Sequence, residues 1–399
     1  MYPNKLHMNT TLISREHDAL FQTYKRLPVV IDHAIGCRVY DTDGNVYLDF
    51  LGGIAVNALG HSHPRIIEAV EKQLRKYMHV SNYFYQEPQI QLAEKLKEMT
   101  GFDRVYFSNS GSESFEGAVK LARKWGNTRG KTEIVGFSGG FHGRTYAPLS
   151  VMDKPLYKNG MEPFLPNNRV LKFNDCEQLR ANVNEATCAI ALEYLQGEGG
   201  VTFATQEFSA TIEELRQQYG FLLIADEVQA GGGRTGHFYG YQHRNAQPDI
   251  VTMAKAIGGG LPLGAILARE HVADEWKPGM HGTTYGGNAL ACVAGLVVLE
   301  ELGHGITDNV WKVGAYLTEK LRAIQQEFPE KITELRGCGM MQGVVLNGES
   351  QPIVNALLTR KVIANATSVN VVRLLPPLTI TTSDVDEFIG HFRAVIAEA

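Results

Sequence analysis

Short apolar runs that alternate with helical patterns constrain the fold of this chain more than any other feature. The runs lie at residues 104–107, 133–136, 189–192, 221–225 and 250–252, and a helical pattern begins near residue 112. Strands that alternate with helices in this way build βαβ units, in which the strands run mostly parallel and helices cover the sheet. The sequence therefore predicts an α/β protein with a mostly parallel central sheet and helices on both faces.

The two ends of the chain show a different pattern, with fewer and more widely spaced elements. A hairpin is predicted first, then a glycine-rich loop, a helix that closes the sheet domain, and a smaller α+β unit. The predicted elements are a hairpin at 37–50, helices near 65–78, 289–302 and 383–398, and strands at 343–346 and 371–374. We predict three segments: an N-terminal segment (1–65), a large domain (66–305) and a C-terminal small domain (306–399).

Composition excludes several classes of protein. The net charge of −5 and the absence of a basic stripe argue against a nucleic-acid partner. The five cysteines are odd in number and include no C-x-x-C pair, so neither a disulfide framework nor a metal site is predicted. The sequence shows no apolar leader and no run near the roughly 18 apolar residues that span a bilayer. We therefore expect a soluble cytoplasmic protein without a membrane partner.

Two strand ends carry residues that suit one cofactor. The run 221–225 ends on Asp226, and the run beginning at Ile250 ends on Lys255, which three glycines follow. Pyridoxal phosphate needs a lysine amine for its aldehyde and a carboxylate that keeps its ring nitrogen protonated. A lone lysine at a strand end more often points into solvent, so this pair requires support from other motifs.

Two glycine-rich segments offer that support. Ser110, Gly111 and Ser112 follow a strand and open a helix, where backbone N–H groups converge on an anion, although the same residues also make an ordinary helix cap. In residues 138–145, Phe141 is suited to stack on a pyridine ring and Arg144 to bind a carboxylate. The alternative is a core phenylalanine and a surface arginine.

Two further loops bear polar groups among glycines. Glu198 lies in the run 193–200, and Thr283 and Thr284 lie in the run 281–288. Each run taken alone is consistent with a turn.

The set of motifs, in this order, resembles the class III aminotransferases, which are pyridoxal-phosphate enzymes of fold type I. The resemblance covers nearly the whole chain and implies a small domain built from both terminal segments. The residues that carry it are Asn109-Ser-Gly111, Phe141-His-Gly-Arg144-Thr, Gln196-Gly-Glu198-Gly-Gly, Asp226-Glu-Val-Gln229, Gly233-Arg-Thr-Gly236, Lys255 and Thr284-Tyr-Gly-Gly-Asn288.

Within the family, the chain is most similar to the acetylornithine aminotransferase branch. Segments such as 53–61, 79–82 and 372–378 carry this similarity, and Ile54 stands where ornithine aminotransferases have a tyrosine. The chain departs from the family pattern at Ser114, Phe115, Tyr194, Ala230, Gly232 and Ala289. These departures leave the acyl group of the substrate open.

The resemblance implies a role for each candidate residue. Lys255 binds the cofactor and moves the proton, Asp226 holds the ring nitrogen protonated, and Glu198 screens one of two carboxylate sites. The remaining cofactor contacts are Ser110, Gly111, Ser112, Phe141, Gln229 and a neighbouring subunit's Thr284; the substrate contacts are Arg144, Thr283, Arg373 and Ile54. The implied partners are an amino donor, 2-oxoglutarate and a second copy of the chain.

Other functions remain open at this point. The first is a related ω-aminotransferase acting on succinylornithine, succinyldiaminopimelate or 4-aminobutyrate. The second is an aminomutase or decarboxylase of the same fold, which Glu198 and Arg373 disfavour. The third is a regulator that binds pyridoxal phosphate without catalysis, which the intact Lys255, Asp226 and both arginines disfavour.

Overall fold

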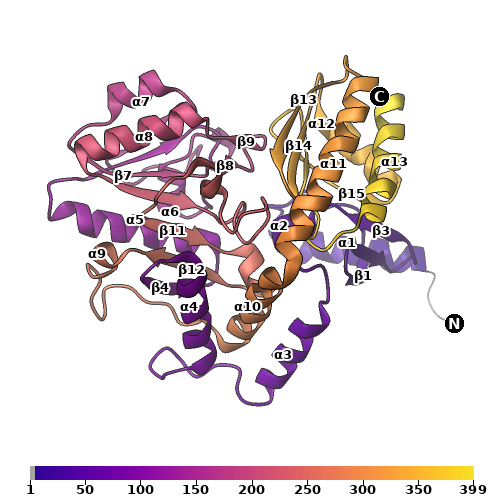
Figure 1. The fold of residues 1–399 in the computed structure, drawn as a ribbon. Helices are drawn as coiled ribbons and strands as arrows, with labels where there is room; N and C mark the ends of the chain where they lie inside the picture. Colours follow the sequence, from indigo (N-terminus) through magenta and orange to yellow (C-terminus); the bar gives the residue numbers. More distant parts are fainter. Residues whose placement is uncertain (1–4) are drawn as a thin grey trace.

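A seven-stranded sheet forms the centre of the larger part of the molecule (Figure 1). The computed structural model describes the backbone of residues 5–399 and the side chains from Thr11 onward. The strand order is β4-β12-β11-β10-β7-β5-β6, and only β12 runs antiparallel to its neighbours. The strands are β4 (Arg104–Ser108), β5 (Glu133–Phe137), β6 (Asn168–Leu171), β7 (Thr187–Leu192), β10 (Leu222–Asp226), β11 (Ile250–Met253) and β12 (Gly264–Ala268). The predicted mostly parallel sheet is confirmed.

Alternate residues along each strand face two separate parts of the core. In β7, Ile190 and Leu192 join one apolar cluster, whereas Ala189 and Ala191 join another that contains Phe115. Because side chains of a strand alternate between faces, both faces of this sheet are buried. The covering helices and connecting helices are α3 (Pro64–Leu74), α4 (Glu87–Thr100), α5 (Gly111–Asn127), α6 (Tyr146–Ser150), α7 (Cys176–Asn182), α8 (Gln206–Tyr219), α9 (Glu270–Ala273) and α10 (Ala289–Glu301).

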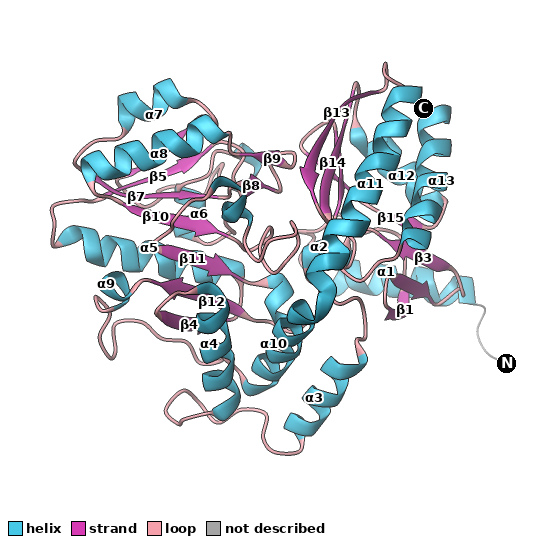
Figure 2. Cartoon of the chain, viewed as in Figure 1, coloured by secondary structure: helices cyan, strands magenta, loops and turns pink. Residues whose placement is uncertain are grey.

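The smaller part combines the two ends of the chain, as the resemblance implied (Figures 1 and 2). It contains two four-stranded sheets, ordered β1-β2-β3-β15 and β13-β14-β17-β16. β15 pairs in parallel with β3, and the rings of Phe50 and Phe388 stack at 4.2 Å, so N- and C-terminal segments share one core. The elements are α1 (Lys5–Ala19), β1 (Ile31–Ile35), β2 (Arg38–Asp41), β3 (Val46–Asp49), α2 (Gly52–Ala55), α11 (Thr307–Glu327), β13 (Ile332–Cys338), β14 (Met341–Leu346), α12 (Ser350–Thr359), β15 (Val362–Ile363), β16 (Asn365–Thr367), β17 (Val371–Leu374) and α13 (Thr382–Glu398).

A helical run from Ala289 to Glu327 connects the two parts. It comprises α10, a π-helical turn at Leu302–Ile306 and α11. The run is long and apolar enough to span a membrane by composition, contrary to the sequence analysis, but α10 packs against α3 and α4 in the core. It is therefore a core helix. The domain boundary predicted at 305/306 falls inside this run and stays a prediction.

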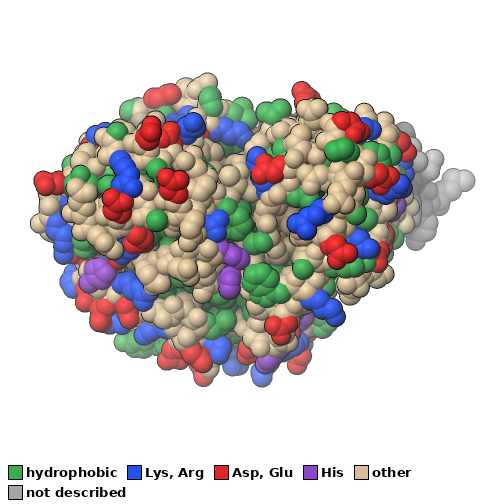
Figure 3. Space-filling view, turned by 45° about the horizontal axis from the view of Figure 1, so that its top comes forward, with side chains coloured by type: hydrophobic (Ala, Val, Ile, Leu, Met, Phe, Trp, Pro, Cys, Tyr) green, Lys and Arg blue, Asp and Glu red, His purple; other side chains and the backbone are tan. Residues whose placement is uncertain are grey.

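Two strands of the large sheet were not predicted. β6 is a four-residue edge strand that ends at Leu171, and β12 is a five-residue strand that pairs antiparallel between β4 and β11. The sequence of β12 is Gly-Ala-Ile-Leu-Ala, and with one β-branched residue beside a glycine and two alanines it gives a weak strand signal. On the face in Figure 3, acidic and basic side chains are interspersed.

Candidate active site

Lys255 and Asp226 lie at the carboxyl-terminal ends of two neighbouring parallel strands. β10 ends at Asp226, and β11 ends two residues before Lys255. Asp226 stands opposite Thr252 in the register of the pair. Lys255 has a φ of +51°, a left-handed conformation that costs a non-glycine residue about 1–3 kcal/mol and concentrates at functional sites. The fold thus brings the acid and the amine to one edge of the sheet, where open α/β sheets bind ligands.

Three groups fix the carboxylate of Asp226. His142 Nδ1 lies 2.6 Å from Asp226 Oδ2, while Thr252 Oγ1 and Val228 N each donate to Oδ1 at 3.1 Å. The His142 ring stacks on Phe115 at 4.2 Å and is buried. Sequence analysis missed His142 as a site residue. A buried carboxylate such as that of Asp226 requires a hydrogen-bond partner, and the position of His142 directly after Phe141 was the signal that could have identified it.

The site collects charges of both signs. Burial lowers the pKa of Lys255, and the positive charge of Arg373 lowers it further. Three carboxylates oppose this shift: Glu193, Asp226 and Glu198. Burial also raises the pKa of Glu193 to about 7. A lysine whose pKa is lowered in this way accepts and returns a proton near neutral pH more readily than an ordinary lysine.

The N-terminus of α5 opens towards the same edge of the sheet. Ser110 caps the helix, and its Oγ accepts a hydrogen bond from Glu113 N at 3.2 Å. The N–H groups of Gly111 and Ser112 have no partner within the helix, as in any first turn, so they are available to an anion. Ser112 Oγ accepts from Arg144 N at 3.3 Å, and Gly143 approaches so closely that a Cβ there would lie 2.1 Å from that oxygen.

Arg373 and Glu198 form a partly buried ion pair across the two parts of the molecule. Arg373 Nη1 lies 2.7 Å from Glu198 Oε1 and 3.0 Å from Gln229 Oε1, while Arg373 Nε donates to Asn365 Oδ1 at 3.0 Å. The side chain of Arg373 is 1% exposed and that of Glu198 is 24% exposed. Although burial raises it, the charge and hydrogen bond of Arg373 hold the pKa of Glu198 below its ordinary value.

The structure leaves four predicted residues at the periphery. Arg144 is exposed, and its guanidinium lies over the Tyr157 ring at 4.2 Å and 5.9 Å from the Phe141 ring. Thr283 Oγ1 accepts from Asn109 Nδ2 at 3.2 Å. Thr284 and Ile54 are exposed. Ile54 has a φ of +63°, which is unusual for a β-branched residue.

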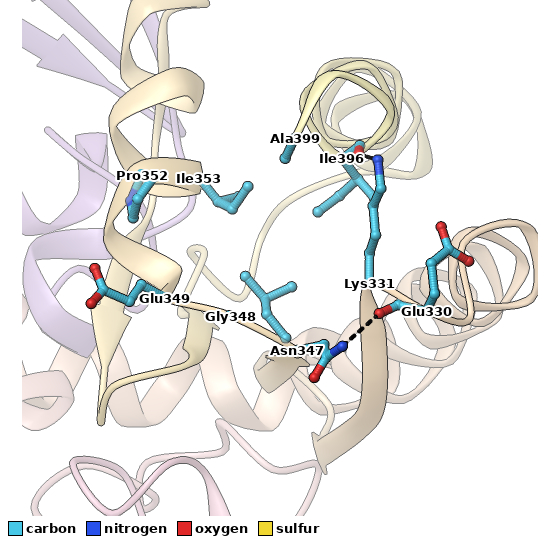
Figure 4. Close-up of a pocket in the computed structure, with 10 residues that line it drawn as sticks. Glu330, Lys331, Asn347, Gly348, Glu349, Pro352, Ile353, Ile396 and Ala399 are labelled. Carbon is cyan, nitrogen blue, oxygen red and sulfur yellow. Dashed lines mark hydrogen bonds between the residues drawn. The ribbon is translucent and has the colours of Figure 1, made fainter.

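One surface cavity lies beside Thr283 and Thr284, and a second lies in the smaller part of the molecule. Thr283 and Thr284 border a surface cavity of about 1060 Å³ together with residues of the segment 81–93. A smaller cavity of about 280 Å³ lies between the C-terminal helix and α12 (Figure 4), and no predicted site residue lines it. Among the residues that the structure describes, no group of three or more His, Cys, Asp and Glu side chains is arranged to hold a metal ion.

A family model for class III aminotransferases matches residues 20–396. The chain belongs to this family. Among curated relatives, it is similar to the acetylornithine aminotransferases of Methanocaldococcus jannaschii and Aquifex aeolicus. Each is 42% identical over 94% of this chain and over 96% and 99% of the relative, respectively.

Solved structures share the fold of this aminotransferase over nearly its full length. The N-acetylornithine aminotransferase from Stenotrophomonas maltophilia is 35% identical with a TM-score of 0.83, covering 97% of this chain and 98% of that one. The ornithine aminotransferase from Toxoplasma gondii ME49 is 29% identical with a TM-score of 0.93, covering 98% and 95%. The predicted family, fold class and transaminase activity are confirmed.

Pyridoxal phosphate is the cofactor of this family, and the residues present fit it. An oriented carboxylate ends β10, and an amine lies two residues beyond the end of the adjacent strand β11. A helix N-terminus with unpartnered N–H groups suits the phosphate. Phe141 is half-buried beside them. The enzyme is a pyridoxal-phosphate-dependent transaminase, as predicted.

Proposed function

We propose that this aminotransferase transfers the terminal amino group of N2-acetyl-L-ornithine to 2-oxoglutarate in arginine biosynthesis in the cytoplasm. The products are N-acetylglutamate 5-semialdehyde and L-glutamate. Curated relatives named acetylornithine aminotransferase, 38–42% identical, support this donor. Ile54, in place of the tyrosine of ornithine aminotransferases, argues against free ornithine. The observation that carries the proposal is the partly buried ion pair between Arg373 and Glu198.

The ion pair matters because the two half-reactions present different numbers of carboxylates. Acetylornithine brings one carboxylate, whereas 2-oxoglutarate and glutamate bring two. Arg373 is buried and paired with Glu198, so its charge is neutralised until a second carboxylate takes the place of Glu198. Arg144 is exposed at the mouth of the site and binds the carboxylate that both substrates share.

When bound, pyridoxal phosphate would supply the electron sink for this chemistry. Lys255 accepts the proton that leaves the substrate carbon and returns it, since burial lowers the pKa of its amine. Asp226, oriented by His142, would hydrogen-bond the ring nitrogen of the cofactor and favour its protonated form. The other proposed contacts are Phe141 against the ring, Gln229 on the phenolic oxygen, Ser110, Gly111 and Ser112 on the phosphate, and Thr283 and Ile54 near the substrate.

A panel of donors tests the proposal. With 2-oxoglutarate as acceptor, we expect kcat/KM to be highest for N2-acetylornithine and lower by about tenfold or more for free ornithine, whose α-ammonium adds a charge that the site does not pair. Succinylornithine, succinyldiaminopimelate and 4-aminobutyrate complete the panel. A higher kcat/KM for any of these donors would assign the enzyme to the corresponding ω-aminotransferase instead.

We also propose a homodimer in which Thr284 of each copy completes the partner's phosphate site. Thr284 is exposed and borders the surface cavity beside residues 81–93. Asn82 Nδ2 binds Thr283 O and Gly286 O at 3.0 and 3.1 Å, so this segment is held against a strip of exposed apolar side chains. The exposed apolar side chains of residues 78–90 and 280–285 are here called the strip: Met78, Tyr83, Phe84, Tyr85, Ile90, Met280 and Tyr285. An apolar strip of this kind marks a protein–protein contact.

Tyr85→Glu is expected to dissociate the dimer and to weaken cofactor binding about tenfold or more, because Tyr85 is fully exposed in the single chain and lies within the strip. Sedimentation and cofactor titration measure both effects. Val46→Glu, on an exposed apolar residue of β3 outside the strip, is the control and should change neither. An active, cofactor-loaded monomer of the parent enzyme would contradict the role of Thr284.

A further inference from the structure

The buried carboxylate of Glu193 connects two loops of the site. Glu193 follows β7 and is 4% exposed. Its Oε1 accepts a hydrogen bond from Phe141 N at 2.8 Å, and its Oε2 accepts one from Gly197 N at 3.2 Å. The first N–H belongs to residues 138–145, here called the Phe141 loop. The second belongs to residues 197–200, here called the Glu198 loop, which lies between the short strands β8 (Leu195–Gln196) and β9 (Thr202–Phe203).

Each loop carries side chains that act on a different part of the substrate site. The Phe141 loop positions His142 for its hydrogen bond with Asp226 and places Arg144 at the mouth of the site. The Glu198 loop positions Glu198 for its ion pair with Arg373. The two carboxylate-binding arginines are therefore governed by two loops, and Glu193 bonds to the backbone of both.

The position of the Glu198 loop depends on contacts that leave little freedom. A Cβ at Gly197 would lie 2.0 Å from Gln229 Oε1, and Gln229 in turn accepts from Arg373 at 3.0 Å. A displacement of Gly197 therefore moves the groups around Arg373. Gln196, the residue directly before the Glu198 loop, adds a second link to the Phe141 loop, because its Nε2 donates to Ser138 O at 2.9 Å.

We propose that Glu193 is a positioning residue for donor selectivity, which holds the Glu198 loop in register with the Phe141 loop so that Glu198 stays paired with Arg373. The inference rests on the proposed gating of Arg373 by Glu198. Its physical basis is that a carboxylate has two acceptor oxygens, whereas an amide has one acceptor and a donor group. Glu193→Gln keeps the shape but leaves one of the two backbone N–H groups facing an NH₂.

The chain provides a matched control in Glu227. Its buried carboxylate also accepts two backbone hydrogen bonds, from Gly240 N at 2.7 Å and Tyr241 N at 2.9 Å. Both N–H groups belong to one segment and neither belongs to the Phe141 or Glu198 loop. Glu227→Gln therefore makes the same chemical change in the core without loosening the Glu198 loop.

The experiment uses holoenzyme and single-turnover kinetics with two donors, glutamate and whichever panel donor the parent enzyme uses fastest. This choice keeps the test valid if acetylornithine is not that donor, so failure of the proposed substrate and failure of the present inference are distinguishable. For Glu193→Gln, we expect kcat/KM for glutamate relative to the other donor to rise about threefold to tenfold, from the loss of one buried hydrogen bond. Glu227→Gln should leave the ratio within about twofold of the parent.

The double variant Glu193→Gln/Glu198→Gln decides how Glu193 acts. Because both changes release the same pair, we expect the ratio of the double variant to match that of Glu198→Gln alone. An additive shift, or an unchanged ratio in Glu193→Gln, would overturn the proposal. If Glu193→Gln does not accumulate as holoenzyme, Gln196→Met removes the other bond between the loops and should shift the ratio in the same direction; an unchanged ratio there would also overturn it.

Discussion

Replacing Lys255 by alanine is expected to abolish transamination while the cofactor still binds. The amine is the group at the strand end whose pKa is lowered by burial and by Arg373, and it is the proposed proton carrier. Loss of a positioned general acid–base group lowers rates by about 10²–10⁴-fold, and loss of the covalent bond to the cofactor adds to this. The phosphate contacts at the start of α5 are unchanged, so cofactor should remain bound. Steady-state rates and cofactor content after dialysis measure the two effects.

Two controls separate the role of Lys255 from general damage. Lys255→Arg retains a positive charge but cannot bond to the aldehyde, so it should be as inactive as the alanine variant. Lys312→Ala changes an exposed lysine on α11 and should retain full activity. A small primary amine added to Lys255→Ala should restore part of the proton transfer. If Lys255→Ala transaminates at an appreciable fraction of the parent rate, the assignment is wrong.

Glu198→Gln is expected to shift donor preference towards glutamate. Without the carboxylate, Arg373 keeps a free positive charge in both half-reactions and attracts the second carboxylate of glutamate at all times. Release of one charge-assisted, partly buried pair corresponds to about 1.5–3 kcal/mol, or roughly a tenfold to hundredfold rise in kcat/KM for glutamate relative to acetylornithine. Because the pKa of Glu198 lies below its ordinary value, the pair is ionised throughout the neutral range, and the effect should not depend on pH there.

Glu207→Gln is the matched control for this variant. Glu207 is an exposed acid in the first turn of α8, near in sequence but without a bond to Arg373. It should leave the donor ratio unchanged. A Glu198→Gln enzyme with the parental ratio would show that Glu198 is not the switch, and Arg373→Lys in both backgrounds would then locate the second carboxylate site.

The sequence alone determined the central sheet, the cofactor and the strand-end pair of Asp226 and Lys255. The strands and the residues at their ends are local features, because each depends on a short apolar run and on the residues that follow it. The cofactor required the full set of motifs, since a lone lysine at a strand end more often points into solvent. The same reasoning missed β12, because its sequence, Gly-Ala-Ile-Leu-Ala, holds one β-branched residue and is otherwise mostly glycine and alanine, which are weak strand formers.

Only the tertiary structure decided which side chains act on one another. Arg373 and Glu198 are 175 residues apart in the sequence and meet where the smaller part of the molecule packs on the large sheet. His142 and Glu193 acquire their partners in the same way, through contacts over 84 residues to Asp226 and over 52 residues to Phe141. No periodicity encodes such contacts, because they depend on how strands and loops distant in sequence are placed beside one another. For that reason the sequence predicted the reacting groups, and the fold determined which side chains surround them.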